Sequence, residues 1–521
     1  MTTDNHNLFA ALRAAFPAEL DATAIETADT ATPLFYTWHD LERGTAMLAN
    51  LIEGLALPEG SRIAVQTEKS VEALMLYLAV LRAGHVFLPL NTAYQASEIE
   101  YFVGNAEPAV VVCAGKNFGW VSKIAFLAGT KHVFTLNEDR TGTLLDRAAF
   151  QSDKHTPAQR RADDVAAILY TSGTTGRSKG AMLTHGNLLS NAQVLHRAWG
   201  WRRPEEGGDV LLHALPIFHV HGLFVASHGA LLAGAKMVWF GRFDPRAVAA
   251  WLPQATVFMG VPTLYVRLLG EPALTKAACA NMRLFVSGSA PLLLETFKSW
   301  QERTGHTILE RYGMSETVML TSNPYRPESA RRGGTVGQTL PGVAVRVHDD
   351  KGVALPAGEI GGIEVRGPNV FKGYWRMPEK TAEEFTADEL GQKWFKTGDV
   401  GRIDADGCVT IVGRSKDLII SGGYNVYPAE IEGYVNDLPG VVESAVVGVP
   451  HKDFGEAVVA VVVRSPGAAL DGAAVVAALK SQIANFKVPK QVFVVDELPR
   501  NAMGKVQKNL LRDQHKTLFG G

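Results

Sequence analysis

Apolar and polar positions divide the first part of the chain into short strands and amphipathic helices. Between residues 60 and 113 the pattern predicts strands and helices in alternation. The expected strands cover 63–66, 86–88 and 109–113, and the expected helices cover 70–83 and 97–102. The same alternation returns between residues 210 and 312, with a helical pattern near Val225. Strand–helix–strand units of this length favour largely parallel sheets covered by helices, here in duplicate.

The pattern changes after about Ser322. Residues 336–404 are dense in glycine and proline, and their short runs predict antiparallel strands, with a hairpin turn at Asp406-Gly407. From Arg414 onward the order of strands and helices is typical of an α+β module of about a hundred residues. We predict a fold of class α/β plus α+β, with a large multi-layer domain at 1–413 and a small domain at 414–521. The large domain is expected to combine parallel α/β sheets with a small β-barrel part.

Length and composition narrow the class of protein. A chain of 521 residues is too long for one hydrophobic core, so two or more are expected. The formal net charge of −2 gives no global attraction to nucleic acid. The three cysteines lie far apart and match neither a disulfide framework nor a metal site, which favours a reducing compartment.

Two segments bear on the location of the protein. Residues 1–16 lack a basic region followed by an apolar one, so we predict no export signal. The most apolar stretch, 211–240, carries four histidines and is not expected to cross a bilayer. We therefore expect a cytoplasmic protein with no membrane span and no nucleic-acid partner.

The sharpest local signal is the segment 170–180, which follows an apolar strand predicted at 165–169. Glycines leave the backbone N–H groups accessible, hydroxyls donate hydrogen bonds, and a lysine supplies positive charge. This combination is suited to binding a polyphosphate. The residues concerned are Thr171, Ser172, Gly173, Thr174, Thr175, Gly176 and Lys179. Their spacing does not match the Walker motif. By composition alone, a flexible surface loop rich in small polar residues is an equally good interpretation.

The segment 170–180 resembles the phosphate loop of the adenylate-forming superfamily, which includes acyl-CoA synthetases, nonribosomal adenylation domains and luciferases. Further motifs of that superfamily follow in the expected order, at 311–317, 396–399, 413–418 and 499–505. The match spans nearly the whole chain. Within the superfamily, the chain is most similar to malonyl-CoA synthetases, on the runs at 67–84, 88–94, 213–224 and 371–381.

The resemblance implies a site for ATP. Its adenine would lie between Tyr312 and the segment 288–291, and its ribose hydroxyls would bind Asp399, with Arg414 beside them. Glu316 and Thr175 would hold Mg²⁺, which prefers oxygen ligands together with phosphates. The other residues implied in nucleotide binding are Ser289, Ala290, Pro291, Glu310, Arg311, Gly313, Met314 and Ser315. Read singly, Tyr312 is equally a core aromatic, and Asp399 a turn residue.

The resemblance also implies two half-reactions and a mobile C-terminal lid. Lys505 would neutralise the charge that develops between the acid and the α-phosphate, with Lys179, Thr175 and Glu316 also in the catalytic set. The lid would then rotate about Lys416, and CoA would enter beside Ser421, Gly422 and Gly423. Lys505 is further implied as the target of a lysine acetyltransferase, since acetylation removes its charge. As isolated residues, these lysines are solvated surface charges and the glycines form a turn.

Candidates for the acyl pocket rest on charge and position. Arg283 is the first candidate to meet a second substrate carboxylate through a bidentate fork, and Arg242 is a weaker one. His219 and Ser289 are placed near the same pocket by the resemblance. If the chain is extended there, His219 and His221 share one face, but no third ligand with suitable spacing supports a metal site.

We therefore predict an acid–thiol ligase that converts malonate, with methylmalonate as a further candidate, to the acyl-CoA, using ATP, Mg²⁺ and CoA. One alternative is a CoA ligase for a medium-chain or aromatic monocarboxylate, for which an apolar pocket would replace the cation. A second is a stand-alone adenylating enzyme that charges a separate carrier protein. A non-enzymatic nucleotide-binding protein fits poorly, because every catalytic position named above is occupied.

Overall fold

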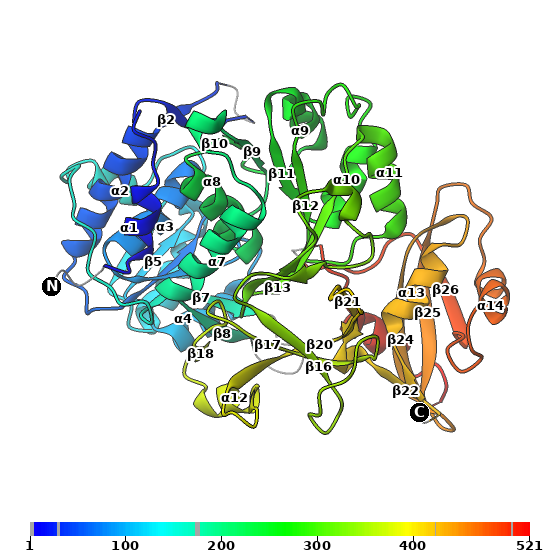
Figure 1. The fold of residues 1–521 in the computed structure, drawn as a ribbon. Helices are drawn as coiled ribbons and strands as arrows, with labels where there is room; N and C mark the ends of the chain where they lie inside the picture. The colour runs from blue at the N-terminus through cyan, green and yellow to red at the C-terminus, as the bar shows by residue number, and fades with distance from the viewer. Residues whose placement is uncertain (1–4, 29–31, 172–177, 423, 502–503, 521) are drawn as a thin grey trace.

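The computed structural model describes residues 5–28, 32–171, 178–422, 424–501 and 504–520. These residues form four sheets, arranged as two large helix-covered sheets, a small antiparallel sheet and a C-terminal sheet (Figure 1). The mixed α/β architecture predicted from the sequence is confirmed.

The first large sheet is mostly parallel and contributes the segments 284–291 and 309–317 to the site. Its middle strands are continuously apolar because helices cover both faces; every residue of Leu284–Ser287, for example, is buried. In spatial order its strands are β15 (Gln338–Thr339), β14 (Val318–Ser322), β13 (Leu309–Met314), β12 (Leu284–Ser287), β11 (Val257–Gly260), β9 (Val210–His213), β10 (Lys236–Trp239), β1 (Thr23–Thr27) and β2 (Phe35–Thr37).

The second large sheet carries the predicted phosphate loop. At one end of the sheet, β7 and β8 pair antiparallel, and residues 172–177, which follow β7 in the sequence, lie outside the described residues. In spatial order its strands are β18 (Gly373–Tyr374), β8 (Lys179–Thr184), β7 (Val165–Thr171), β4 (Val86–Pro89), β3 (Arg62–Gln66), β5 (Val110–Cys113) and β6 (His132–Thr135).

Two five-stranded sheets complete the described fold. The first is antiparallel, holds the hairpin predicted at Asp406-Gly407, and consists of β16 (Ala344–His348), β17 (Gly361–Arg366), β20 (Lys393–Ile403), β19 (Phe385–Ala387) and β21 (Val409–Arg414). The second consists of β23 (Tyr424–Val426), β22 (Ile419–Ser421), β25 (Gly455–Arg464), β24 (Val441–His451) and β26 (Gln491–Val495). The chain therefore passes between sheets after Arg414. The domain boundary at 413/414 stays a prediction.

Helices fill the space between and around the sheets. In the large N-terminal part they are α1 (Leu8–Ala14), α2 (Trp38–Glu53), α3 (Val71–Arg82), α4 (Ala96–Ala106), α5 (Phe118–Leu127), α6 (Thr143–Ala148), α7 (His185–Ala198), α8 (His228–Ala233), α9 (Pro245–Trp251), α10 (Pro262–Leu269), α11 (Leu294–Thr304) and α12 (Pro378–Glu383). The C-terminal part has α13 (Pro428–Asn436), α14 (Gly472–Lys480) and α15 (Lys508–His515).

Helix α3 shows why the two large sheets form one body. Ser70 caps its N-terminus, and every residue from Val71 to Arg82 is buried. A helix that is apolar all round is typical of a layer enclosed on both sides. The Tyr77 hydroxyl on α3 makes a 2.8 Å hydrogen bond with His228 Nε2 on α8, so helices attached to the two sheets meet in one core.

The segment around the paired histidines differs from the extended conformation that we considered. His219 lies in a turn, and a π-helix, His221–Ser227, follows it and continues into α8. His219 and His221 therefore do not share one face of a strand. Within the described residues, no cluster of three or more His, Cys, Asp or Glu side chains is arranged to hold a metal ion.

Candidate active site

The phosphate-binding end of the site is built where β7, β8 and β18 meet. Thr171 ends β7 and Lys179 begins β8, while Ser172, Gly173, Thr174, Thr175 and Gly176 lie outside the described residues. The Lys179 ammonium lies 3.2 Å from Glu384 Oε1 and 4.3 Å from the ring centre of Tyr374. A mostly buried lysine is thus held beside the predicted phosphate loop.

Glu316 lies beside the same tyrosine. Its side chain is buried, and its Oε1 accepts a 3.0 Å hydrogen bond from the Tyr374 hydroxyl. Burial raises the pKa of Glu316, while the Tyr374 hydrogen bond and the positive charges of Arg414 and Lys179 oppose that rise. A hard carboxylate oxygen surrounded by cationic groups suits a site that binds a metal–phosphate complex.

Asp399 is the centre of the predicted ribose site. It is buried in β20, accepts a hydrogen bond from the Tyr312 hydroxyl, and pairs with Arg414 Nε at 2.7 Å. The pairing follows from strand register, because Asp399 and Arg414 are directly opposite each other on β20 and β21. Burial raises the pKa of Asp399, and the charge of Arg414 lowers it. Three predicted nucleotide-binding residues from distant segments are therefore in contact.

Lys505 reaches the same place from the C-terminal part of the chain. Its side chain is exposed to the open site, yet the protein atoms around it displace enough water to lower its pKa. Arg414 lowers that pKa further, whereas Asp399 and Glu316 raise it. The lysine is thus within electrostatic range of the predicted ribose and metal ligands.

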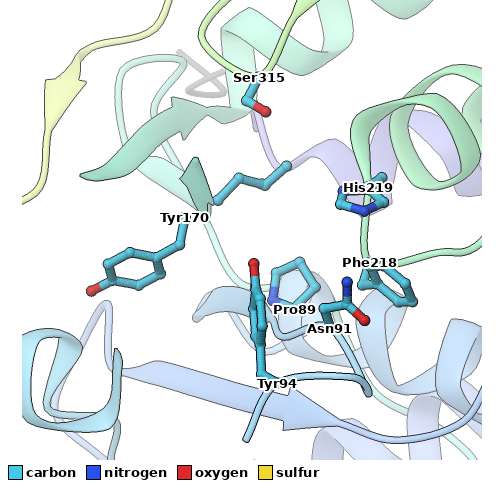
Figure 2. Close-up of a pocket in the computed structure, with 8 residues that line it drawn as sticks. Pro89, Asn91, Tyr94, Tyr170, Phe218, His219 and Ser315 are labelled. Atoms are coloured by element: carbon cyan, nitrogen blue, oxygen red, sulfur yellow. The ribbon is translucent and has the colours of Figure 1, made fainter. Parts of the chain in front are cut away.

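His219 lines a small cavity opposite Ser315 (Figure 2). The cavity has room for about 10 Å³ and is also lined by Asn91, Tyr94 and Phe218. That space is close to the requirement of one water molecule. Burial and, to a smaller extent, the charge of Lys505 together lower the pKa of His219 to about 3, so the imidazole is neutral at physiological pH.

Arg311 is the cation that lies deepest in the site. It is buried on β13, and its Nε and Nη2 have no hydrogen-bond partner within the described residues. Gly288 allows it to lie there, since a Cβ on Gly288 would be 2.5 Å from the Arg311 guanidinium carbon. The charge of Arg311 lowers the pKa of both His221 and Lys505, and the Ser289 hydroxyl is 3.5 Å from His221 Nδ1.

Burial lowers the pKa of Arg311 to about 9, because water no longer stabilises its charge. No carboxylate among the described residues forms an ion pair with it. A buried charge without a partner is costly, and native proteins normally pair it. The arrangement therefore favours an anionic ligand at Arg311.

Arg283, our first candidate for binding a second carboxylate, is differently placed. Its Nη2 is 2.6 Å from Asp209 Oδ2, its Nε is 2.7 Å from Asp209 Oδ1, and its Nη1 donates to the Trp199 carbonyl oxygen. The fork that was expected to bind a substrate is thus occupied by a buried carboxylate, which argues against this assignment. Arg242 is an exposed residue in the bend after β10.

The other predicted residues surround this centre. Ala290 and Pro291 are exposed in the loop after β12, and Gly313 and Met314 end β13. Glu310 is buried, accepts a hydrogen bond from Gly334 N–H, and has its pKa raised by burial to about 8. In the C-terminal part, Lys416 lies in the 3-10 turn Ser415–Asp417, Ser421 ends β22, Gly422 has φ +59°, and Gly423 lies outside the described residues.

Two residues were not singled out from the sequence, Tyr374 and Glu384. Tyr374 lies in the run at 371–381 that carried the resemblance, but nothing in its own type marks it as functional. Its importance follows from contacts with Lys179 and Glu316, which lie 195 and 58 positions away (374 − 179 and 374 − 316).

Comparison with known proteins identifies the class. The model of the AMP-binding enzyme family matches residues 14–375, and that of the AMP-binding enzyme C-terminal domain matches residues 430–505. The chain belongs to the AMP-binding enzyme family. Its fold is that of an adenylate-forming enzyme.

Individual relatives narrow the comparison. A malonate–CoA ligase of Arabidopsis thaliana is 35% identical over 88% of this chain and 79% of its own length. A feruloyl-CoA synthase of Amycolatopsis is also 35% identical, over 94% of this chain and 95% of its own length. The crystal structure of ATP-bound MatB from Rhodopseudomonas palustris is 53% identical, covers 99% of this chain and 100% of its own, and has a TM-score of 0.94. The apo structure of the same protein has a TM-score of 0.83.

No helix in the described part of the chain is both long and apolar enough to cross a bilayer.

Proposed function

We propose that this chain is an AMP-forming malonate–CoA ligase, which converts malonate, ATP and CoA into malonyl-CoA, AMP and pyrophosphate. Methylmalonate is a second candidate acid. The similarity to CoA ligases supports this activity, and the Arabidopsis malonate–CoA ligase supports malonate as the acid. The observation that carries the proposal is the buried guanidinium of Arg311, which has no ion-pair partner among the described residues.

Arg311 favours a dicarboxylate over a monocarboxylate. A malonate whose reacting carboxylate lies near Lys505 would carry its second carboxylate a short distance away, and Arg311 is close enough to affect the pKa of Lys505. Nε and Nη2 of one guanidinium are suited to bidentate recognition of a carboxylate. A monocarboxylate would leave the same buried charge unpaired. We therefore assign the second carboxylate to Arg311, in place of Arg283.

In the first half-reaction, a carboxylate oxygen of malonate attacks the α-phosphate of ATP. The bond between the α-phosphorus and the oxygen bridging to the β-phosphate breaks, which releases pyrophosphate and leaves malonyl-adenylate. Asp399 holds the ribose, Lys179 binds the phosphates, and Lys505 neutralises the charge that develops between the acid and the α-phosphate. The protein forms no covalent bond, so its contribution is position and charge.

Mg²⁺ fits the ligand chemistry of the site, because Glu316 supplies a hard oxygen next to the cations that bind phosphate. We propose Glu316 as its protein ligand, together with Thr175. Bound Mg²⁺ would neutralise charge on the phosphates.

In the second half-reaction, the sulfur of CoA attacks the carbonyl carbon that is bonded to the phosphate oxygen of AMP. The thiol proton passes to solvent, the bond between that carbon and the phosphate oxygen breaks, and AMP leaves. We propose that the C-terminal part rotates about Lys416 for this step, which withdraws Lys505 and brings Ser421 to Gly423 to the site. The greater similarity to the ATP-bound relative, with a TM-score of 0.94 against 0.83 for its apo form, supports an adenylating arrangement of this structure. The cavity at His219 has room for about 10 Å³, which is too small for the pantetheine arm of CoA. This supports a rearrangement of the site before the arm enters.

The similarity to the feruloyl-CoA synthase makes an aromatic monocarboxylate the second candidate substrate. Transfer to a carrier protein instead of CoA is a further alternative. We also propose a cytoplasmic location, and acetylation of Lys505 as a means of regulation. An acetylated enzyme that retains full adenylating activity would contradict this last point.

The test is production of AMP and acyl-CoA from ATP, Mg²⁺ and CoA with a panel of acids. The panel contains malonate, methylmalonate, succinate, acetate, octanoate, benzoate and ferulate. A strong preference for malonate is expected. Preference for benzoate, ferulate or octanoate would reject the dicarboxylate site, and AMP formation that needs a carrier protein would reject the CoA step.

A further inference from the structure

Tyr374 lies between two side chains of opposite charge that belong to the phosphate end of the site. Its hydroxyl donates a 3.0 Å hydrogen bond to Glu316 Oε1, and its ring face lies 4.3 Å from the Lys179 ammonium. The tyrosine side chain is buried, and so is Glu316. The Tyr374 side chain therefore contacts the anionic residue through its hydroxyl and the cationic residue through its ring.

The backbone fixes Tyr374 in this position. Strand β18 pairs with β8, so that Tyr374 is opposite Ala181 near the start of the strand that Lys179 begins. The Tyr374 N–H donates to the Thr381 hydroxyl at 2.9 Å, and the N–H of Phe371 donates to the Glu316 carbonyl oxygen at 2.8 Å. The same short segment is thus bonded both to the phosphate-loop strand and to the Glu316 backbone.

The spacing of the two charges has a chemical consequence. If Lys179 paired directly with Glu316, its ammonium would compete with Mg²⁺ for the carboxylate oxygens of Glu316. The ring of Tyr374 offers Lys179 a cation–π contact in place of the Glu316 carboxylate, which the Tyr374 hydroxyl binds. On its other side Lys179 pairs with Glu384, which also lies 3.4 Å from Lys380 and is therefore not dependent on Lys179 for charge balance.

We propose that Tyr374 is a positioning residue that keeps Glu316 and Lys179 apart and oriented toward the phosphates of the nucleotide. The inference rests on the proposed function in one respect, because it assumes that a Mg²⁺–nucleotide complex binds at these two residues. It does not depend on the identity of the acid.

The central experiment uses calorimetry to measure the binding of ATP to the full chain at increasing Mg²⁺ concentrations, with no acid or CoA present. The Mg²⁺ concentration at which half of the maximal ATP binding is reached is the Mg²⁺ midpoint. Tyr374→Phe keeps the ring and removes the hydroxyl. The variant loses a hydrogen bond to the charged Glu316 carboxylate, and we therefore expect its Mg²⁺ midpoint to rise about 10- to 100-fold. In turnover assays, KM for MgATP should rise while KM for malonate stays unchanged. Because a midpoint does not depend on the amount of folded protein, partial unfolding would not hide the result.

Tyr36→Phe is the matched control. The Tyr36 hydroxyl donates to Glu72 Oε1 at 2.6 Å, and both side chains are buried as in the Tyr374–Glu316 pair, but at another place in the fold. It should leave the Mg²⁺ midpoint unchanged. A double-mutant cycle with Glu316→Gln gives the second check, since Tyr374→Phe should add almost nothing once the carboxylate is gone.

The outcomes separate the two proposals. A Mg²⁺ midpoint in Tyr374→Phe within twofold of the parent, or full additivity in the cycle, would overturn the role of Tyr374 and leave the malonate proposal intact. A parent enzyme that prefers another acid in the panel, but shows the expected shift in Tyr374→Phe, would overturn the substrate and leave the positioning role intact.

Discussion

Replacement of Arg311 by methionine tests the substrate assignment most directly. Methionine keeps much of the side-chain length and removes the charge. Truncating one partner of a buried, hydrogen-bonded charge pair costs about 3 kcal/mol, which corresponds to a fall of about 150-fold in kcat/KM for malonate. The loss should be specific, because acetate has no second carboxylate to place at Arg311.

The free enzyme should respond in the opposite direction. Arg311 is buried, and two of its nitrogens have no partner in the part of the chain that the structure describes, so removing its charge removes an uncompensated desolvation cost. We expect the Tm of Arg311→Met to equal or exceed that of the parent. Arg331 is the control: it is also buried, but its guanidinium donates to the carbonyl oxygens of Pro324 and Tyr325. Arg331→Met should lower Tm, because those acceptors lose their donors.

The assay is the rate of AMP formation against acid concentration for malonate and acetate, with Tm measured by scanning calorimetry. A folded Arg311→Met variant that keeps kcat/KM for malonate within threefold of the parent would refute the reasoning. Equal losses for malonate and acetate would also refute it, since they would place Arg311 in the nucleotide site and not at the second carboxylate.

The remaining predictions concern three other charged positions. Lys505→Ala should abolish pyrophosphate release from ATP and malonate while supplied malonyl-adenylate is still converted to malonyl-CoA; equal loss in both half-reactions would show that its role is misassigned. Because the surroundings of Lys505 lower its pKa, its charge is lost at lower pH than for a free lysine, so adenylation should decline as pH rises in the alkaline range, and Lys505→Arg should move that decline to higher pH. Arg283→Met should leave the ratio of malonate to acetate activity unchanged but destabilise the fold by about 3 kcal/mol in urea titrations, because Asp209 would stay buried with only Arg202, 3.4 Å away, as an ion-pair partner; a changed ratio would return Arg283 to the acyl pocket. Glu384→Gln should lower KM for MgATP, because phosphate no longer competes with a carboxylate for Lys179, and an unchanged or higher KM would mean that Glu384 helps to hold the lysine in place.

Local patterns were sufficient for the elements that carry the fold. Strands predicted at 63–66, 86–88 and 109–113 correspond to β3, β4 and β5, because buried parallel strands are continuously apolar. The helix predicted at 70–83 is α3, whose Ser70 cap and Gly84 terminator are local signals. The hairpin at Asp406-Gly407 follows from turn chemistry. The histidine segment was harder, since a turn entering a π-helix has no distinct sequence period.

The family and the order of its motifs were also determined by the sequence, since each motif is a contiguous run. Pairings across the chain were not. Arg283 and Arg311 are both arginines beside apolar strands. Only the tertiary structure places Asp209 against the first and, within the described residues, no carboxylate against the second. The same holds for Tyr374, whose contacts with Lys179 and Glu316 arise where two sheets meet. The charge of a side chain is set by its type, but which charge is left for a substrate depends on what packs around it.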